Sequence, residues 1–485
     1  MGSMMNASTA ARSPSDPVGP DVRAVFDRQC EAFLRDGAPE LSRRRADLAK
    51  LARAIREDAE RIAGVIAADF GNRSAGETLL AEVLTTLTAI RHTSRHLARW
   101  MRPRRVTVGL ELMPARARIL CQPLGVIGII SPWNYPFSLA VTPLAAALAA
   151  GNRVIVKPSE LTVRTADFLA DFLTRLFPAE QVAVVQGGPE TGAAFARLPF
   201  DHLFYTGSTS VGREVMKAAA ENLTPVTLEL GGKSPCIVTE DADFARAVDS
   251  IIYGKLLNAG QTCIAPDYVF IPEAWRDRFV ERARQAVRRL YPTLADNPDY
   301  TSIVNDHHYR RLLSYVEEAR TCGATVIEIN PAGAPIERAT RKLAPMLVLD
   351  PDDSLAVMRD EIFGPVLPVK TYHRLDEAID YINARPHPLA LYYFGGNAGR
   401  RDTVLQRTRS GGVTVNDTLL HVVCEGLPFG GIGASGMGSY HGEAGFLTFS
   451  HRRSVFLQSR ISGTRLLRPP FGLLFAKMIK LLLAR

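Results

Sequence analysis

Four short apolar runs that alternate with helical stretches most constrain the fold of this 485-residue chain. The runs occupy residues 126–130, 153–156, 182–185 and 202–205, and the helical stretches between them cover 138–150, 163–176 and 189–197. Continuous apolar strands separated by helices are typical of a parallel sheet that is covered on both faces. The pattern therefore predicts an α/β fold.

The segments that follow these strands are candidates for a ligand site, because ligands bind at the carboxyl ends of the strands in such sheets. They read Pro132-Trp-Asn-Tyr-Pro136, Lys157-Pro-Ser-Glu160, Gln186-Gly-Gly188 and Thr206-Gly-Ser-Thr-Ser-Val-Gly212. The last one leads into a helix predicted over about 210–222, and the free N–H groups of a helix start attract phosphate. We therefore expect a Rossmann-like sheet that binds a dinucleotide, with Gly207 and Ser208 in the cofactor site.

A literal GxGxxG also occurs, at Gly431-Ile-Gly-Ala-Ser-Gly436. No strand–turn–helix unit surrounds it, so we do not expect it to be a dinucleotide fingerprint.

The rest of the chain predicts a helical start and a second α/β segment. Residues 21–100 have helical periodicity, and residues 106–121 read as a two-stranded hairpin around Pro114. After residue 232, helices are expected near 244–258, 273–291, 309–322 and 375–384, and strands near 236–238, 268–271, 325–327, 389–394 and 413–415.

Composition excludes several classes of protein. The six cysteines are scattered without a CxxC or a Cys/His cluster, so neither a disulfide framework nor a metal site is expected. The net charge of +8 comes without the signature of a nucleic-acid-binding module, so we expect no nucleic-acid partner. No secretion or lipidation signal is apparent, which predicts a cytoplasmic protein.

The two ends of the chain differ from the rest. Residues 1–20 are rich in Ser, Ala, Pro and Gly and are expected to be disordered. Residues 471–485 are apolar and basic, but too short and too charged to span a bilayer. We expect this segment to dock on the protein's own surface or on a partner subunit, with peripheral membrane contact as the alternative.

Cys263 is the candidate nucleophile, because it lies among small and polar residues in Asn258-Ala-Gly-Gln-Thr-Cys263 and not in an apolar run. Asn134 lies between prolines on a restricted loop, and its side-chain N–H could join the Cys263 N–H in holding an oxyanion. Glu229 is flanked by Leu228 and Leu230, which should raise its pKa and suit it to act as a base for water.

Other polar residues suit a dinucleotide. Lys157 and Glu160 follow a buried strand and could bind ribose hydroxyls. Glu361 could hold a second ribose, with Phe363 against a nicotinamide ring, and we include Trp133 in the same cofactor set.

Six motifs in the same order resemble those of the aldehyde dehydrogenase superfamily over about residues 30–460. They are Pro132-Trp-Asn-Tyr-Pro136, Lys157-Pro-Ser-Glu160, Leu228-Glu-Leu-Gly-Gly-Lys-Ser-Pro235, Gly260-Gln-Thr-Cys263, Glu361-Ile-Phe-Gly-Pro365 and Pro428-Phe-Gly-Gly-Ile-Gly-Ala-Ser-Gly436. Gly436-Met-Gly-Ser-Tyr-His-Gly442 is similar to the class 3 group. Ala68-Asp-Phe-Gly-Asn-Arg-Ser74 is most similar to the bacterial coniferyl aldehyde dehydrogenases.

The resemblance implies roles for the candidate residues. Cys263 would be the nucleophile, Asn134 the oxyanion donor and Glu229 the general base. Lys157 and Glu160 would hold the adenine ribose and Glu361 the nicotinamide ribose. The aldehyde would be oxidised to its acid through a thiohemiacetal and a thioester on Cys263, with NAD preferred because Glu160 would repel a 2′-phosphate, although NADP stays open.

The resemblance also implies an architecture. We expect a cofactor-binding domain over 21–105 and 122–228, a catalytic α/β domain over 229–428, and an amphipathic tail over 461–485. Bridging strands over 106–121 and 450–460 would join two subunits in a homodimer.

The substrate stays open at this stage. Aromatic hydroxycinnamaldehydes such as coniferyl aldehyde follow from the resemblance, and long aliphatic aldehydes are the alternative. Two further alternatives are transfer of the acyl group to coenzyme A, against which Glu229 argues, and a non-catalytic binding protein.

Overall fold

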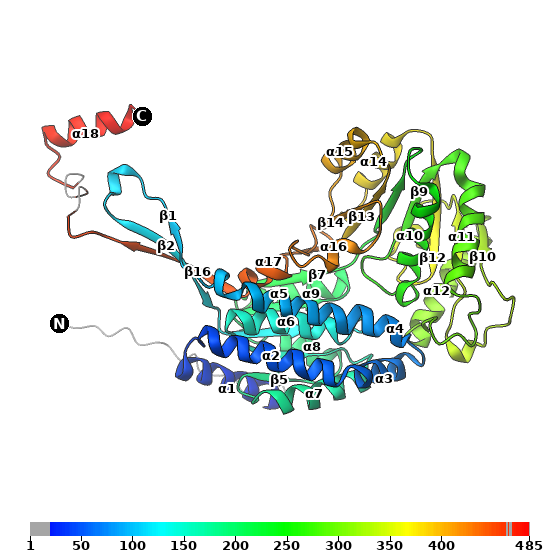
Figure 1. The fold of residues 1–485 in the computed structure, drawn as a ribbon, viewed down its shortest axis with the longest axis horizontal. Helices are drawn as coiled ribbons and strands as arrows, with labels where there is room; N and C mark the ends of the chain where they lie inside the picture. The colour runs from blue at the N-terminus through cyan, green and yellow to red at the C-terminus, as the bar shows by residue number, and fades with distance from the viewer. Residues whose placement is uncertain (1–19, 462–463, 465–467, 485) are drawn as a thin grey trace.

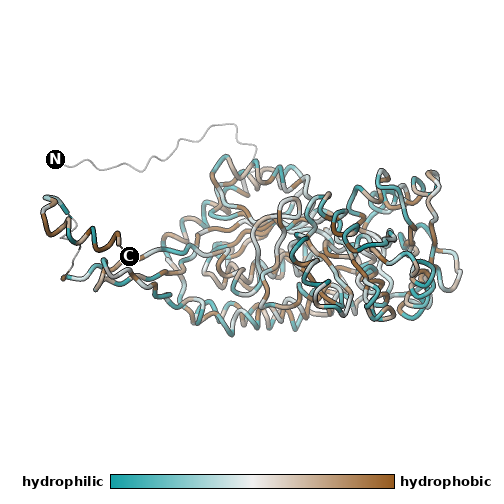
Figure 2. Tube along the Cα trace, turned by 90° about the horizontal axis from the view of Figure 1, so that it is seen from above, coloured by the Kyte–Doolittle hydropathy of each residue, from teal (hydrophilic) through white to brown (hydrophobic). Residues whose placement is uncertain are grey.

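The computed structural model describes residues 20–461, 464 and 468–484. The segment expected to be disordered lies outside them, except for Pro20, which begins α1 (Pro20–Asp36). Figure 1 shows two sheet-and-helix bodies side by side and a narrow arm that reaches away from them. The hydropathy colours of Figure 2 place most of the brown, apolar trace inside the two bodies.

The first body is built on a six-stranded sheet in the order β15-β7-β6-β3-β4-β5, and β7 to β5 are parallel. The strands are β3 (Val126–Ile130), β4 (Arg153–Lys157), β5 (Val182–Val184), β6 (His202–Thr206), β7 (Val226–Glu229) and β15 (Gly436–Met437). Every residue of β3 and β6 is buried, as their continuous apolar sequence requires. The predicted parallel α/β sheet is confirmed.

Helices cover both faces of this sheet (Figure 1). The helices inserted between the strands are α6 (Ser138–Ala150), α7 (Val163–Leu176), α8 (Pro189–Ala196) and α9 (Thr209–Ala220). Those that precede the sheet in the chain include α2 (Leu41–Glu57), α3 (Ala59–Phe70), α4 (Ala75–Thr78) and α5 (Thr85–Trp100). Between α4 and α5 the chain makes a π-helical turn, η1 (Leu79–Leu84).

The second body is built on a seven-stranded sheet in the order β10-β11-β12-β9-β8-β13-β14. Its strands are β8 (Pro235–Val238), β9 (Tyr268–Pro272), β10 (Thr325–Glu328), β11 (Met346–Leu349), β12 (Val366–Tyr372), β13 (Ala390–Phe394) and β14 (Gly412–Val415). Its helices include α10 (Phe244–Leu256), α11 (Arg276–Leu290), α12 (Asp306–Thr321), α14 (Leu375–Asn383) and α15 (Ala398–Arg407).

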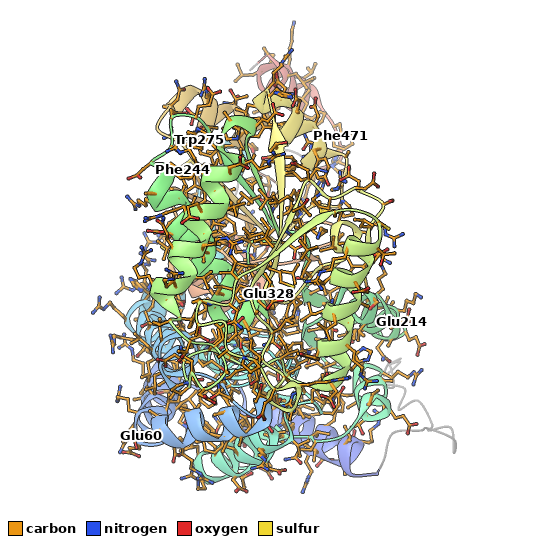
Figure 3. All side chains as sticks on the ribbon, turned by 90° about the vertical axis from the view of Figure 1, so that its right-hand side faces the viewer. Glu60, Glu214, Phe244, Trp275, Glu328 and Phe471 are labelled. Atoms are coloured by element: carbon orange, nitrogen blue, oxygen red, sulfur yellow. The ribbon has the colours of Figure 1, made fainter. Side chains whose placement is uncertain are left out.

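Aromatic packing holds the outer helices of the second body. Phe244 at the start of α10 and Trp275 before α11 lie side by side in Figure 3, with ring centroids 5.1 Å apart. The aromatic rings therefore fix the two helices against each other over one face of the sheet.

The arm is a three-stranded antiparallel sheet in the order β1-β2-β16. β1 (Arg104–Val106) and β2 (Arg116–Pro123) form the predicted hairpin, which starts two residues earlier than expected, and β16 (Ser450–Leu457) pairs with β2 along its whole length. β16 is an edge strand, and Phe456 and Leu457 are 48% and 44% exposed.

The last helix, α18 (Leu473–Leu483), lies beyond the arm in Figure 1 and is brown in Figure 2. None of its residues is buried, so it does not dock on the described part of its own chain, contrary to one expectation from the sequence. Within the described residues no helix is both long and apolar enough to cross a bilayer.

Candidate active site

Cys263 follows a strained turn at the end of α10. Asn258 and Ala259 have φ values of 53° and 52°, and Gly260 follows with a φ of 77°. A Cβ at Gly260 would lie 2.3 Å from the Gly364 carbonyl oxygen, so this position excludes a side chain. Left-handed backbone at two residues other than glycine costs free energy and persists only where surrounding contacts impose it.

Gln261 supplies many of those contacts from a fully buried position. Its amide nitrogen donates to the carbonyl oxygens of Asn258 at 3.0 Å and Ser302 at 3.1 Å, and its amide oxygen accepts the Val304 N–H at 3.0 Å. Glu77 accepts the Asn258 N–H at 3.0 Å. These bonds fix the turn that presents Cys263.

Asn134 lies on the loop after β3 and is 3% exposed. Its Nδ2 donates to the Gln261 carbonyl oxygen at 3.1 Å, and its own carbonyl oxygen accepts from Asn258 Nδ2 at 3.0 Å. The Tyr135 hydroxyl contacts Thr262 Oγ1 at 2.7 Å. The structure therefore brings the Asn134 loop of the first body against the Cys263 turn of the second.

An ion pair that the sequence analysis missed holds the Asn134 loop from behind. Arg73 Nη1 lies 3.3 Å from Glu82 Oε1, and neither side chain is exposed. Arg73 also donates to the Asn134 carbonyl oxygen at 2.6 Å, while Glu82 Oε2 accepts the N–H groups of Phe137 and Ser138. Burial raises the pKa of Glu82, and the charge of Arg73 offsets this rise only in part. The sequence signal that could have pointed to this pair is the presence of Arg73 in Ala68–Ser74, one of the segments on which the family resemblance rests.

Glu229 ends β7 and is 2% exposed. Neither of its carboxyl oxygens has a hydrogen-bond partner among the residues that the structure describes. Burial raises the pKa of Glu229 well above its ordinary value, as the flanking leucines predict. A buried carboxyl group without partners is a base that can bind a water molecule or a ligand hydroxyl.

Glu361 is a second carboxyl group near the thiol, and it is half-buried. Its Oε1 has no partner within the described chain, and a Cβ on Gly231 would lie 2.2 Å from its Oε2. Burial, followed by the charge of Asp267, raises the pKa of Glu361 to about 8. Burial and the charges of Glu361 and Glu229 in turn raise the pKa of Cys263 to about 12. The thiol is therefore protonated at neutral pH, and its thiolate is a strong nucleophile once formed.

The carboxyl edge of the six-stranded sheet carries the other cofactor candidates. Lys157 ends β4, is 3% exposed and donates to Glu160 Oε2 at 2.7 Å. Ser208 caps α9, and its Oγ accepts the Val211 N–H at 3.4 Å. A Cβ at Gly207 would lie 2.3 Å from the Tyr205 hydroxyl, so Gly207 leaves the backbone bare at this edge.

Two aromatic candidates meet beside this edge. The rings of Trp133 and Phe363 lie 5.3 Å apart at an angle of 70°, and Phe363 has a φ of 52°. The Gly431–Gly436 segment does not form a strand–turn–helix unit. Instead, Gly436 pairs with Glu229, and Ser435 accepts the Leu230 N–H at 3.1 Å, so the segment supports the strand that carries the carboxyl group.

A cavity of about 600 Å³ opens onto Cys263. Its wall is mainly apolar and draws on the π-helical turn, the Asn134 loop, the Cys263 turn and the chain between β14 and α17 (Gly442–Thr448), with Leu84, Leu139, Ile264 and Phe429 among its residues. An apolar cavity with a thiol in its wall suits a small hydrophobic substrate that carries one reactive polar group.

The family model described as "Aldehyde dehydrogenase family" matches residues 18–455. The chain belongs to the aldehyde dehydrogenase family. It is 48% identical over 464 residues to a probable coniferyl aldehyde dehydrogenase of Pseudomonas aeruginosa, with 96% of each chain covered. It is 46% identical to the coniferyl aldehyde dehydrogenase of a Pseudomonas species, with 96% of this chain and 98% of the relative covered.

Solved aldehyde dehydrogenases share the fold. The structure described as the substrate-bound state of Staphylococcus aureus AldH has a TM-score of 0.90 and 38% identity, covering 95% of this chain and 99% of that one. An indole-3-acetaldehyde dehydrogenase of P. syringae in complex with NAD⁺ has a TM-score of 0.82 and 25% identity, with 90% and 89% covered. Aldehyde dehydrogenases use NAD or NADP, so this chain is an NAD(P)-dependent oxidoreductase.

Proposed function

We propose that this aldehyde dehydrogenase oxidises hydroxycinnamaldehydes such as coniferyl aldehyde to the corresponding acids, with Cys263 as the nucleophile. The observation that carries the proposal is the position of Cys263 in the wall of an apolar cavity, on a turn that is bonded to Asn134. The names of the two Pseudomonas relatives support the aromatic substrate.

In the first step the Cys263 thiol gives its proton to water, and the thiolate adds to the aldehyde carbon. A thiohemiacetal forms, and the carbonyl electron pair moves to the oxygen. One N–H of the Asn134 amide is bonded to the Gln261 carbonyl oxygen, which leaves the second N–H and the Cys263 N–H for the oxyanion. A preorganised donor of this kind contributes about 3–4 kcal/mol to transition-state stabilisation.

The residues at the sheet edge fit a dinucleotide. Lys157 and Glu160 would hold one ribose, Gly207 and Ser208 would lie beside the phosphates, and the orphaned Oε1 of Glu361 would accept a hydroxyl of the second ribose. A bound dinucleotide would supply the acceptor for the hydride that leaves the thiohemiacetal carbon, and that carbon becomes the carbonyl carbon of a Cys263 thioester. Trp133 and Phe363 would flank the nicotinamide ring of the dinucleotide, with their aromatic pair excluding water.

Glu229 acts in the second step. Its carboxylate removes a proton from water, the hydroxide adds to the Cys263 thioester, and the carboxylic acid leaves as the thiolate is restored. Its two unpartnered oxygens and its raised pKa support this role.

An aldehyde panel tests the proposed function. We expect coniferyl aldehyde to have the highest kcat/KM, followed by benzaldehydes, with aliphatic aldehydes of six to sixteen carbons at least about tenfold lower. NADH formation is measured for each aldehyde. A maximum at long aliphatic aldehydes would replace the aromatic assignment, and the absence of NADH with every aldehyde would indicate a non-catalytic binding protein. A requirement for coenzyme A would indicate acyl transfer.

We also propose that the enzyme prefers NAD to NADP because of Glu160. Burial is the largest single effect and raises the pKa of Glu160, but the hydrogen bond from Lys157, a backbone N–H bond and the Lys157 charge together outweigh it, so the pKa is lowered and the carboxylate is charged at neutral pH. A charge near the ribose would repel a 2′-phosphate by about 1–4 kcal/mol. Glu160→Gln should therefore raise the NADP-to-NAD ratio of kcat/KM by roughly 10–100-fold. An unchanged ratio would contradict this role, and Glu214→Gln, at an exposed carboxyl group on α9, is the matched control.

The partner that we propose is a second copy of this chain, bound through the free edge of β16. An exposed edge strand with apolar side chains is a template for strand pairing, and Phe456 and Leu457 are half exposed there. Light scattering should show a dimer, and Phe456→Asp should shift it to monomer.

The alternative for α18 is peripheral membrane contact. In that case anionic vesicles would retain the full chain but not a chain ending at residue 467.

A further inference from the structure

Two residues that line the substrate cavity each carry a buried polar atom with no hydrogen-bond partner within the described chain: Nδ1 of His441 and Oε2 of Glu425. His441 is 8% exposed, and its ring stacks on Phe429 with centroids 5.4 Å apart. One carboxyl oxygen of Glu425 accepts a hydrogen bond from the Gly442 N–H, and the other has no partner within the described chain. Buried polar atoms without partners are rare and indicate a missing ligand atom or water.

The chemistry of the two groups is complementary. The other ring nitrogen of His441 donates to the Val422 carbonyl oxygen, and burial lowers the pKa of His441 to about 4, so the ring is neutral and Nδ1 is an acceptor. Burial raises the pKa of Glu425 to about 7, so near neutral pH its carboxyl group occurs both as a donor and as an acceptor. The Glu425 carboxyl group lies beside His441, because it accepts the N–H of the next residue, Gly442. A hydroxyl group, which donates once and accepts twice, matches the needs of both atoms.

We propose that Glu425 and His441 form a polar subsite in the aldehyde cavity that binds a hydroxyl group carried by the substrate away from its aldehyde carbon. The proposal rests on the proposed function, because it assumes that the aldehyde binds in this cavity. It assigns the substrate class as hydroxylated aldehydes, the phenolic ones fitting the aromatic wall of Phe429 and Tyr440.

The subsite discriminates mainly through the hydrogen bonds that an aldehyde without the hydroxyl group cannot form with Glu425 and His441. An aldehyde without the hydroxyl group would displace any water there and leave both polar atoms unpaired in an apolar cavity. Sites built to bind a hydroxyl group reject analogues that lack it far more strongly than apolar pockets reject an extra methylene. We expect a difference on the order of 10–100-fold in affinity.

Equilibrium binding to the full-length Cys263→Ala variant in the presence of NAD tests the subsite without turnover. The ligands are coniferyl aldehyde and its O-methylated analogue, 3,4-dimethoxycinnamaldehyde, which differ only at the phenol. Coniferyl aldehyde should bind roughly 10–100-fold more tightly. Adding Glu425→Leu should reduce the ratio to about threefold or less, and adding Glu425→Gln should retain most of it.

Two controls keep the result interpretable. Binding of the dimethoxy analogue at its original Kd or more tightly shows that the cavity of the Glu425→Leu variant is folded, because the substitution removes a polar atom that this analogue leaves unpaired. Glu443→Leu is the control substitution, at a carboxyl group that is 56% exposed outside the cavity. His441→Asn, which tolerates the φ of 79° at this position, is a second variant that should lose the preference.

Equal affinity for the two ligands, or a preference that survives both Glu425→Leu and His441→Asn, would overturn the subsite. Neither result would affect NADH formation by the wild-type enzyme, whose absence would instead overturn the proposed function.

Discussion

Cys263→Ala should lower kcat/KM for aldehyde oxidation by roughly 10⁴-fold or more, because loss of the nucleophile removes both covalent intermediates. The backbone turn that carries residue 263 is held by Gln261 and Glu77, so the variant should fold normally. NADH formation measures the loss. The cofactor candidates lie on other segments, so the Kd for NAD should stay within about twofold.

The other cysteines provide matched controls for this substitution. Cys322 and Cys424 are exposed free thiols, and Cys322→Ala and Cys424→Ala should each retain wild-type kcat within about twofold. Turnover by Cys263→Ala above a few per cent of wild type would show that another group is the nucleophile. A loss of NAD binding in the same variant would attribute the effect to the fold.

Glu229→Gln should give a rapid burst of NADH that approaches the concentration of active sites, followed by steady turnover that is lower by about 10²–10⁴-fold. The amide retains the shape of the side chain but cannot accept a proton from water, so the thioester forms and persists. Stopped-flow absorbance separates the two phases.

The pH dependence of thioester hydrolysis distinguishes a base from a structural carboxyl group. The folded pKa of Glu229 lies well above its ordinary value, and only the ionised form can accept a proton. The hydrolysis rate of the wild-type enzyme should therefore rise as pH increases through that raised pKa, and Glu229→Gln should lose the rise. If Glu229→Gln gave no burst, Glu229 would be needed at or before hydride transfer and not only for thioester hydrolysis.

Four strands of the first sheet, β3 to β6, could be predicted from the sequence nearly residue by residue, whereas β7 and β15 were not among the predicted strands. These strands and the helices between them have clear apolar patterns, and α6 and α7 begin and end at the residues predicted from those patterns. β12 was missed because Pro368 interrupts it, although a central strand normally excludes proline. β11, a run of four residues, and α15 were also missed.

Some residues of the candidate site could likewise be predicted from the sequence, and others could not. Cys263, Asn134 and Glu229 were predicted because their motifs are local in the sequence. The Arg73–Glu82 pair and the Glu425–His441 atoms were missed, because their importance depends on burial and on contacts between distant segments. Burial without partners is a property of the folded chain, and neither periodicity nor spacing records it.

Mass spectrometry of the trapped intermediate tests the central claim most directly. Glu229→Gln is mixed with NAD and coniferyl aldehyde, quenched in acid during the burst and digested. We predict that the peptide containing Cys263 gains the mass of the acyl group, in proportion to the NADH formed. NADH formation with Cys263 unmodified, or an acyl group on another cysteine, would contradict the account.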